Sequence, residues 1–295
     1  MRPRWSSATN GVVYSFLKSQ SVVSFFVLRL NISMSKSQKE LAFLRNLYIE
    51  TDWTERFTNL FDENFKFSDE KKFLYINAGT GNHALALREK LDENSELWAL
   101  PGNTKLLNIA KAKAEAVNAD ISFFSDFPAE KVDAVLADAS FVQPAELETF
   151  LARIIKLSNN EVMFFLPTAG SFGDIFSFLW ETFLKADLLE YGAEVERLII
   201  EIPTISKVEK TVESLGLTKV KTENKSEFFE FESGEEFINS PLVADFLFPL
   251  WLHFLDAKEQ KRVREKLVQT IDDDRSELSF RFYVKMTLVS GKKKL

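Results

Sequence analysis

The stretch Phe73 to Leu87, FLYINAGTGNHALAL, constrains the fold more than any other part of the chain. It begins with an apolar run typical of a buried strand, turns through Gly79 and Gly81, and continues in an Ala/Leu pattern that favours a helix. A strand, a glycine turn and the start of a helix form the first unit of many nucleotide-binding folds. A tight turn without a ligand needs the same residues, so both interpretations stay open.

Strand-like and helix-like patterns then alternate along the chain. Strands are predicted at 73–76, 97–100, 121–124, 132–137 and 162–166, and helices between them at 82–91, 104–117 and 144–157. Such alternation predicts an α/β fold with a doubly wound, mostly parallel sheet. Ligands of these sheets bind beyond the carboxyl ends of the strands, so the residues that follow each strand are the candidates for a site.

Composition excludes several classes of function. The chain has 295 residues, a net charge of −7 and no cysteine, which disfavours non-specific binding to nucleic acid or anionic lipid and excludes disulfides and thiolate catalysis. The two histidines, His83 and His253, are too few for a histidine-rich metal site, and we expect no metal. The absence of cysteine fits a reducing compartment, and we expect a cytoplasmic protein.

The first 33 residues differ from the rest. They hold no acidic residue but four basic ones, Arg2, Arg4, Lys18 and Arg29, and their apolar runs are shorter than the roughly 20 residues that span a bilayer. An organelle transit peptide or a secretory signal would share some of these features. We favour an upstream extension, with Met34 as the true start, and expect residues 34–295 to form one domain. Its helical cover is predicted at 168–215 and 235–272.

Taken together, the order of these patterns resembles the class I S-adenosylmethionine-dependent methyltransferases, particularly those that act on small molecules. The segments that carry the resemblance are FLYINAGTG, ISFFSDF, VDAVLADASF and FRFYVKMTLVSGKK, which correspond to the glycine-rich motif, the third strand, the fourth strand and the last strand. The resemblance runs from Lys36 to the C-terminus. It implies a seven-stranded sheet in which the C-terminal strand is antiparallel.

The resemblance also implies a site. S-adenosylmethionine would place its methionine end against Asn77, Ala78, Gly79 and Gly81, and its adenine near Asp126 and Phe127. Its methyl group would point toward 138–141 and 170–180. The implied partner is a small-molecule acceptor, with no nucleic acid and no membrane.

Three positions depart from the family's pattern. Tyr75 stands where the family has an acid, Asn77 stands for a glycine, and Pro101 replaces the acid that accepts hydrogen bonds from the ribose. Asparagine tolerates a positive φ, so the second change is mild. We hypothesise that the amide of Asn103 partly replaces the acid lost at Pro101.

Methyl transfer from a sulfonium is an in-line displacement that depends on orientation and is helped by a base. The candidate bases are Asp138, just after the fourth strand, and His83, although a histidine in the first turn of a helix commonly faces solvent. The aromatic stretch that begins at Phe172 is either core packing or an apolar lid.

Two other functions stay open. One is a catalytically silent methyltransferase-fold protein that has lost cofactor binding, because three ligand-side positions depart together. The other is a nicotinamide-dependent dehydrogenase, since Gly79, Gly81 and Ala84 satisfy the spacing G-x-G-x-x-A. In that case the acid expected about 20 residues further on is again replaced by Pro101. The oligomeric state cannot be predicted from the sequence.

Overall fold

A computed structural model describes residues 36–66, 71–273 and 279–294. The proposed N-terminal extension, residues 1–33, and the proposed start at Met34 lie outside the described residues. The residues from Lys36 onward form one compact unit built on a single seven-stranded sheet.

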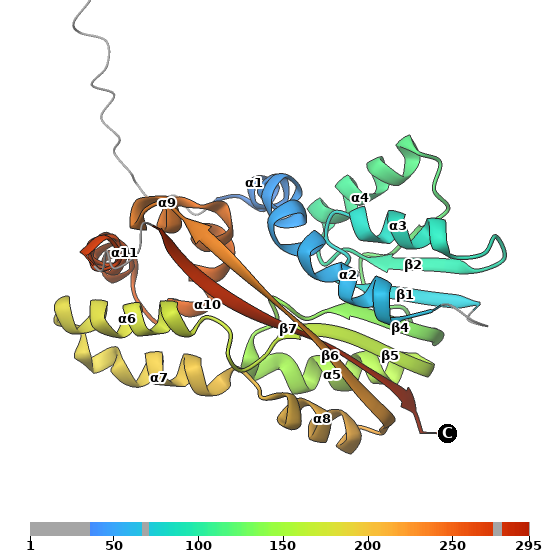
Figure 1. The fold of residues 1–295 in the computed structure, drawn as a ribbon. Helices are drawn as coiled ribbons and strands as arrows, with labels where there is room; N and C mark the ends of the chain where they lie inside the picture. The colour runs from blue at the N-terminus through green and yellow to red at the C-terminus, as the bar shows by residue number, and fades with distance from the viewer. Residues whose placement is uncertain (1–35, 67–70, 274–278, 295) are drawn as a thin grey trace, which may run out of the picture. The chain divides into compact units, whose positions relative to one another are not determined.

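The sheet has the strand order β3-β2-β1-β4-β5-β7-β6 (Figure 1). Its strands are β1 (Lys72–Ile76), β2 (Glu96–Leu100), β3 (Ser122–Phe123), β4 (Val132–Asp138), β5 (Ser158–Pro167), β6 (Leu217–Phe231) and β7 (Phe280–Lys293). The five strands β1 to β5 pair in parallel, whereas β7 is antiparallel to both β5 and β6. The prediction of a doubly wound, mostly parallel sheet with an antiparallel C-terminal strand is therefore confirmed.

Strand β1 shows why these residues form a central strand. Phe73, Leu74, Tyr75 and Ile76 are all buried, and alternate side chains belong to opposite faces of the sheet. Phe73 and Tyr75 pack beneath the N-terminal helices, while Leu74 and Ile76 pack with residues of α5 and α8. A strand covered on both faces reads as a continuous apolar run, as the sequence does here.

Helices cover both faces of the sheet. They are α1 (Gln38–Leu44), η1 (Arg45–Thr54), α2 (Glu55–Asn64), α3 (Asn82–Lys90), α4 (Thr104–Ala116), α5 (Pro144–Leu157), α6 (Gly173–Lys185), η2 (Leu189–Tyr191), α7 (Gly192–Glu201), α8 (Ile205–Ser214), α9 (Gly234–Asn239), η3 (Leu242–Leu247), α10 (Phe248–Trp251) and α11 (Ala257–Asp273). In Figure 1, α2, α3 and α4 lie on one side of the sheet, and α5 and α8 on the other. None of the helices in the described part of the chain combines the length and apolar character needed to span a bilayer.

The N-terminal helical run passes through two residues of the type that commonly caps a new helix, Asp52 and Thr54, without a break between Gln38 and Asn64. Its middle part, η1, is a π-helix, and Thr54 has helical dihedral angles and makes no side-chain capping bond. Ile49, Trp53 and Phe57 are fully buried, so tertiary packing overrides the local capping signal.

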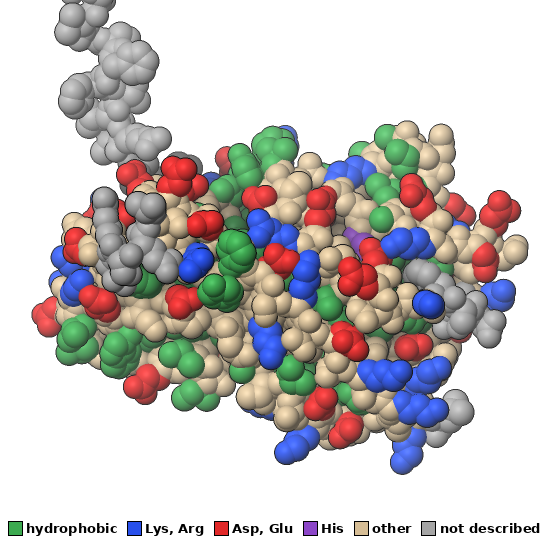
Figure 2. All heavy atoms as spheres, viewed as in Figure 1, with side chains coloured by type: hydrophobic (Ala, Val, Ile, Leu, Met, Phe, Trp, Pro, Cys, Tyr) green, Lys and Arg blue, Asp and Glu red, His purple; other side chains and the backbone are tan. Residues whose placement is uncertain are grey.

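The aromatic stretch after β5 belongs to the core. Phe172, Phe176 and Phe183 are buried, and α6 packs against α11 and β7. Core packing, rather than a free lid, therefore accounts for these rings. Trp180 and Leu184 of α6 and Ile200 of α7 are exposed. Figure 2 shows hydrophobic side chains gathered on the surface in the region of these two helices.

Candidate functional site

The turn after β1 has the backbone geometry that its glycines suggested. Asn77, Gly79 and Gly81 have φ values of 57°, 61° and 88°, in the left-handed region that glycine and asparagine tolerate best. Gly81 is the N-cap of α3, and Ala78 donates its N–H to the carbonyl of Leu100 in β2 at 3.1 Å. The turn is thus fixed to the neighbouring strand, and the substitution of glycine by Asn77 is conformationally mild.

This turn lies at the topological switch point of the sheet. Strands β2 and β3 extend to one side of β1, and β4 and the later strands extend to the other. The Asn77 side chain bridges this point, because its Nδ2 donates to the main-chain carbonyl of Asp138 at 2.8 Å. Open α/β sheets bind their ligands in the crevice outside such a switch point.

A carboxylate from the N-terminal helical run lies on this turn. Glu50, in η1, is 1% exposed, and its Oε1 accepts the N–H of Thr80 at 3.0 Å. A Cβ placed on Gly79 would lie 2.6 Å from this oxygen and 3.4 Å from Nε of Arg45. The missing side chain of Gly79 therefore makes room for Glu50, a group of the protein itself.

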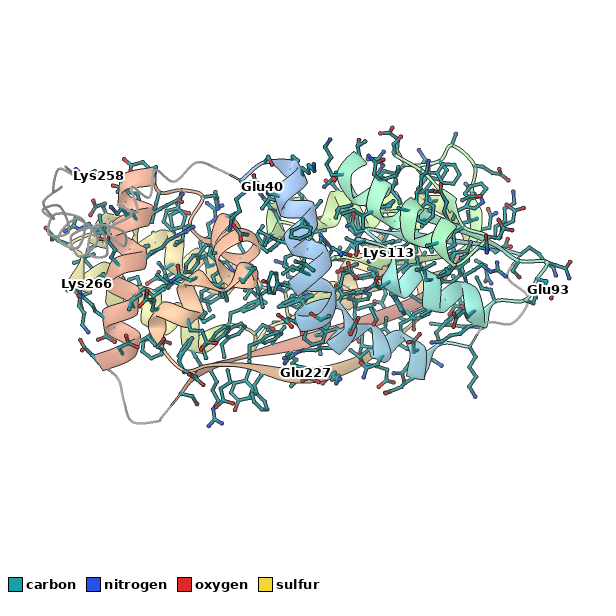
Figure 3. The ribbon with its side chains drawn as sticks, turned by 90° about the horizontal axis from the view of Figure 1, so that it is seen from above. Glu40, Glu93, Lys113, Glu227, Lys258 and Lys266 are labelled. Atoms are coloured by element: carbon teal, nitrogen blue, oxygen red, sulfur yellow. The ribbon has the colours of Figure 1, made fainter. Side chains whose placement is uncertain are left out.

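Two cations accompany that carboxylate. The guanidinium of Arg45 lies 3.9 Å from the Asp138 carboxylate, and Nζ of Lys113 donates to the Thr80 hydroxyl at 3.0 Å and to the Asn82 side chain at 2.5 Å. Figure 3 shows Lys113 between the α3–α4 side of the molecule and the helical run α1–η1–α2. Partial burial lowers the pKa of Lys113, and the charge of Glu50 opposes that effect.

Asp138 is the buried acid at the end of β4. Burial raises its pKa above the ordinary value, and the charge of Arg45 and hydrogen bonds from Ser140 oppose the rise. Its Oδ1 accepts the N–H of Ser140 at 2.8 Å. A buried carboxyl group with a raised pKa at the switch point of the sheet is a candidate for proton transfer, which makes Asp138 the stronger of the two candidate bases.

His83 occupies a different environment from the solvent-facing position that a first-turn histidine commonly has. It is buried, with Nδ1 3.2 Å from the Tyr75 hydroxyl and Nε2 3.4 Å from Oδ1 of Asp62. Burial raises the pKa of Tyr75 far above its ordinary value, so the phenol is neutral. Tyr75 and His83 thus hold each other within the core, and a structural role explains both.

The two residues considered for the ribose side, Pro101 and Asn103, provide no carboxylate for it. Pro101 has no side-chain acceptor, and Oδ1 of Asn103 already accepts the N–H groups of Lys105 and Leu106 at 2.9 and 3.0 Å, as the N-cap of α4. Only the amide nitrogen of Asn103 is left to interact with a ribose. Asn103 therefore cannot replace the missing acid as a hydrogen-bond acceptor for the ribose and can act there only as a donor.

Asp126 and Phe127 follow the short strand β3. Asp126 is exposed, and one of its carboxylate oxygens accepts the hydroxyl of Ser125 at 3.0 Å. The guanidinium carbon of Arg153 lies 3.5 Å from the centre of the Phe127 ring. This stacking holds the ring in place, so both residues stay candidates for contact with an adenine.

Glu50, Arg45 and Lys113 are the site residues that sequence reasoning missed. Arg45 and Glu50 are five residues apart, a spacing that places side chains on different faces of an α-helix. The i→i+5 pitch of the π-helix brings them nearer to one line. No α-helical pattern could have grouped them. The described residues include no group of three or more metal-ligating side chains placed to hold a metal ion.

No family model matches the chain, and no curated protein matches it. Solved structures do match. The YcgJ protein from Bacillus subtilis aligns with a TM-score of 0.51 and 12% identity over 82% of this chain and 99% of its own. A putative methyltransferase from Bacillus halodurans aligns with a TM-score of 0.49 and 12% identity, over 81% of this chain and 98% of its own. Phosphoethanolamine N-methyltransferase 2 from Haemonchus contortus, in complex with S-adenosylhomocysteine, aligns with a TM-score of 0.49 and 12% identity, over 88% of this chain and 58% of its own.

The chain has the class I methyltransferase fold. At such low identity the likeness concerns the fold alone, and the function has to be argued from the site.

The charges at the switch point fit one end of S-adenosylmethionine. Nε of Arg45 is buried without a hydrogen-bond partner among the described residues, so it is available to a carboxylate. The carboxyl group of Asp138 is buried at the same point and can face a cationic centre of the ligand. The ribose end fits less well because Pro101 offers no side-chain acceptor. The N–H of Thr80 can bind a ligand only when Glu50 leaves it.

Proposed function

We propose that this protein is an S-adenosylmethionine-dependent methyltransferase that acts on a small-molecule acceptor. The observation that carries the proposal is the left-handed glycine turn at the switch point between β1 and β4, with the buried acids Glu50 and Asp138 and the half-buried cations Arg45 and Lys113 beside it. A ligand with an ammonium, a carboxylate and a sulfonium needs such mixed charges. S-adenosylmethionine supplies an activated methyl group, so the protein has to orient the acceptor and take up its proton.

In this proposal each group of the site has a defined task. Arg45 binds the carboxylate end of the cofactor, the turn 77–81 lets the backbone approach it, and Asp126 with Phe127 contacts the adenine. Asp138 takes the proton of the acceptor, because its raised pKa and its position at the end of β4 suit a base.

The acceptor is expected to be flat or apolar in part. Phe141 lies three residues after the end of β4, and its ring is 5.5 Å from the guanidinium carbon of Arg45 and 5.2 Å from the ring of Trp53. Aromatic walls beside a few polar groups are typical of small-molecule pockets. This supports a small acceptor with an apolar face, next to the charged end of the site.

A catalytically silent methyltransferase-fold protein is the second candidate. The observation that favours it is the hydrogen bond from Thr80 to Glu50, because an internal carboxylate takes the place of a ligand group. Pro101 and the capping role of Asn103 also weaken the ribose contacts.

Calorimetric titration with S-adenosylhomocysteine separates the two candidates. The methyltransferase predicts saturable binding to the wild type, and the Asp138→Asn variant should still bind, with lower affinity, while it loses turnover with an acceptor. Absence of binding at millimolar ligand, in a protein that melts cooperatively, would refute the methyltransferase and support the silent candidate.

A further inference from the structure

We propose that η1 is a displaceable strap, and that Glu50 is an internal ligand of the glycine turn that has to withdraw before a nucleoside cofactor binds. The identity of that cofactor rests on the proposed function. The strap itself rests on contacts within the described residues, and it can be tested without any ligand.

The first observation is that Glu50 already makes the contacts a ligand would make. Its carboxylate accepts the N–H of Thr80 at 3.0 Å and lies against the bare Cα of Gly79. A glycine turn before a helix binds anions because its N–H groups are unpaired. Here an anion of the chain itself fills that position, so a cofactor carboxylate or an amino-acid tail would compete with it directly.

The second observation is that the strap is seated at an energetic cost. Seven side-chain polar atoms of the described residues are buried without a hydrogen-bond partner, and five of them lie in η1. These five atoms are Nε of Arg45, Oδ1 of Asn46, Oε2 of Glu50, Nε1 of Trp53 and Oγ1 of Thr54. A polar atom that is buried without a partner is less stable there than in water. A segment that carries this many is poised to exchange its contacts for those of a ligand or of water.

The third observation is where the helical run is anchored. Ile49, Trp53 and Phe57 are fully buried and hold its C-terminal half in the core. In the N-terminal half, Phe43 is 58% exposed, Leu47 45% and Tyr48 40%. Glu50 lies between Ile49 and Trp53 and therefore belongs to the anchored half. It can leave the turn through a change of helical pitch in this segment, which the lightly packed residues before Ile49 do not oppose.

The backbone of the segment supports such a movement. A π-helix of ten residues, Arg45–Thr54, is long for a conformation that usually occurs as a single turn. Its i→i+5 pitch is what sets Glu50 on the turn beside Arg45. A return of this segment to α-helical pitch would rotate Glu50 away from Thr80, so a change of helix type can release the turn.

The test compares the wild type with Glu50→Gln and with Glu55→Gln as the matched control. Glu55 is an exposed acid of the same helical run. Like Glu50, its charge opposes the lowering of the Lys113 pKa by burial, but the N–H of Thr80 is bound to Glu50 and not to Glu55. Hydrogen–deuterium exchange is measured on peptides that cover 45–54 and 77–85, and S-adenosylhomocysteine is titrated into each protein.

The strap predicts that Glu50→Gln raises exchange in both peptides about ten-fold and lowers the Kd for S-adenosylhomocysteine by a similar factor, as expected when a charged hydrogen bond becomes a weaker neutral one. The Glu55→Gln variant should behave as the wild type. Ligand added to the wild type should raise exchange in 45–54 while it lowers exchange in 77–85.

Two results would overturn the strap. One is unchanged exchange in Glu50→Gln; the other is weaker ligand binding by that variant, which would make Glu50 a fixed part of the cofactor site. If neither the wild type nor the two variants bind S-adenosylhomocysteine, the proposed function is refuted. The strap is then tested only by the hydrogen–deuterium exchange of the unliganded proteins. If Glu50→Gln does not fold, Glu50→Asp, which shortens the side chain and keeps its charge, takes its place with the same predictions.

Discussion

Replacement of Gly79 by alanine tests the contact on which the site depends. The new methyl group meets two penalties. Gly79 has a φ of 61°, a region that costs an L-residue roughly 1–2 kcal/mol. The Cβ would also lie 2.6 Å from Oε1 of Glu50, so the carboxylate must leave the N–H of Thr80. Loss of a hydrogen bond to a charged group costs about 1.5–3 kcal/mol. The expected loss of stability is therefore about 2.5–5 kcal/mol.

A double-mutant cycle separates the two penalties. In a Glu50→Ala background the carboxylate is absent, so Gly79→Ala should cost only the backbone strain of roughly 1–2 kcal/mol. The coupling energy between the two positions is then about 1.5–3 kcal/mol. Free energies of unfolding come from urea titrations followed by circular dichroism, with the slope m checked for constancy.

Gly216 supplies the matched control. It also has a left-handed backbone, with a φ of 100°, but a Cβ placed there has no neighbour within 4 Å. Gly216→Ala should cost roughly 1–2 kcal/mol in both backgrounds. Equal costs of Gly79→Ala with and without Glu50 would refute the reasoning, since the carboxylate could not then lie on the turn.

Three further predictions concern residues of the same site. Asp138→Asn keeps the acceptor for Ser140, and because burial raises the pKa of Asp138, the folded state holds its proton more tightly than the unfolded chain does. The stability that comes from this tighter proton binding is complete below the unfolded pKa of 3.8 and is lost as the pH rises. The Asp138→Asn variant should therefore have a larger free energy of unfolding than the wild type at pH 7. Urea titrations should show that this difference disappears near pH 3.8. A difference that grows toward low pH would contradict this sign. Asn103→Ala should lower the free energy of unfolding by about 1 kcal/mol through loss of the helix cap, and Asn103→Ser should restore it. If Asn103→Ser also has the wild-type affinity for S-adenosylhomocysteine, the Asn103 amide makes no contact with the ribose. Tyr75→Phe leaves Nδ1 of His83 without its partner and should cost about 1–3 kcal/mol in chemical denaturation, whereas a neutral outcome would exclude that hydrogen bond.

The sheet could be predicted from the sequence because its strands carry their own signal. A central strand such as β1 is apolar on both faces, and the helices between the strands repeat with a helical period. Helix α5 begins and ends at the predicted residues, 144 and 157. Strand β3 is shorter than predicted, only Ser122–Phe123, because it lies at the edge of the sheet and pairs with β2 alone.

The candidate site could be predicted only in part. The turn at Asn77, Gly79 and Gly81 was visible, because left-handed backbone requires glycine or tolerates asparagine. The roles of Asn103 and His83 were not visible, since a side chain's hydrogen-bond partner depends on what packs against it. Asn103 caps a helix, and His83 bonds the buried Tyr75.

The order of strands and helices, and the place of the glycine turn within it, were determined by the sequence alone, because apolar periodicity and glycine act over short distances along the chain. Only the tertiary structure decided what lies on that turn. Glu50 reaches Thr80 from 30 residues away, and it does so through a π-helix that local propensity gives no reason to expect. Long-range packing of Ile49 and Trp53 seats that helix, so the group that occupies the turn is a property of the folded core rather than of any short motif.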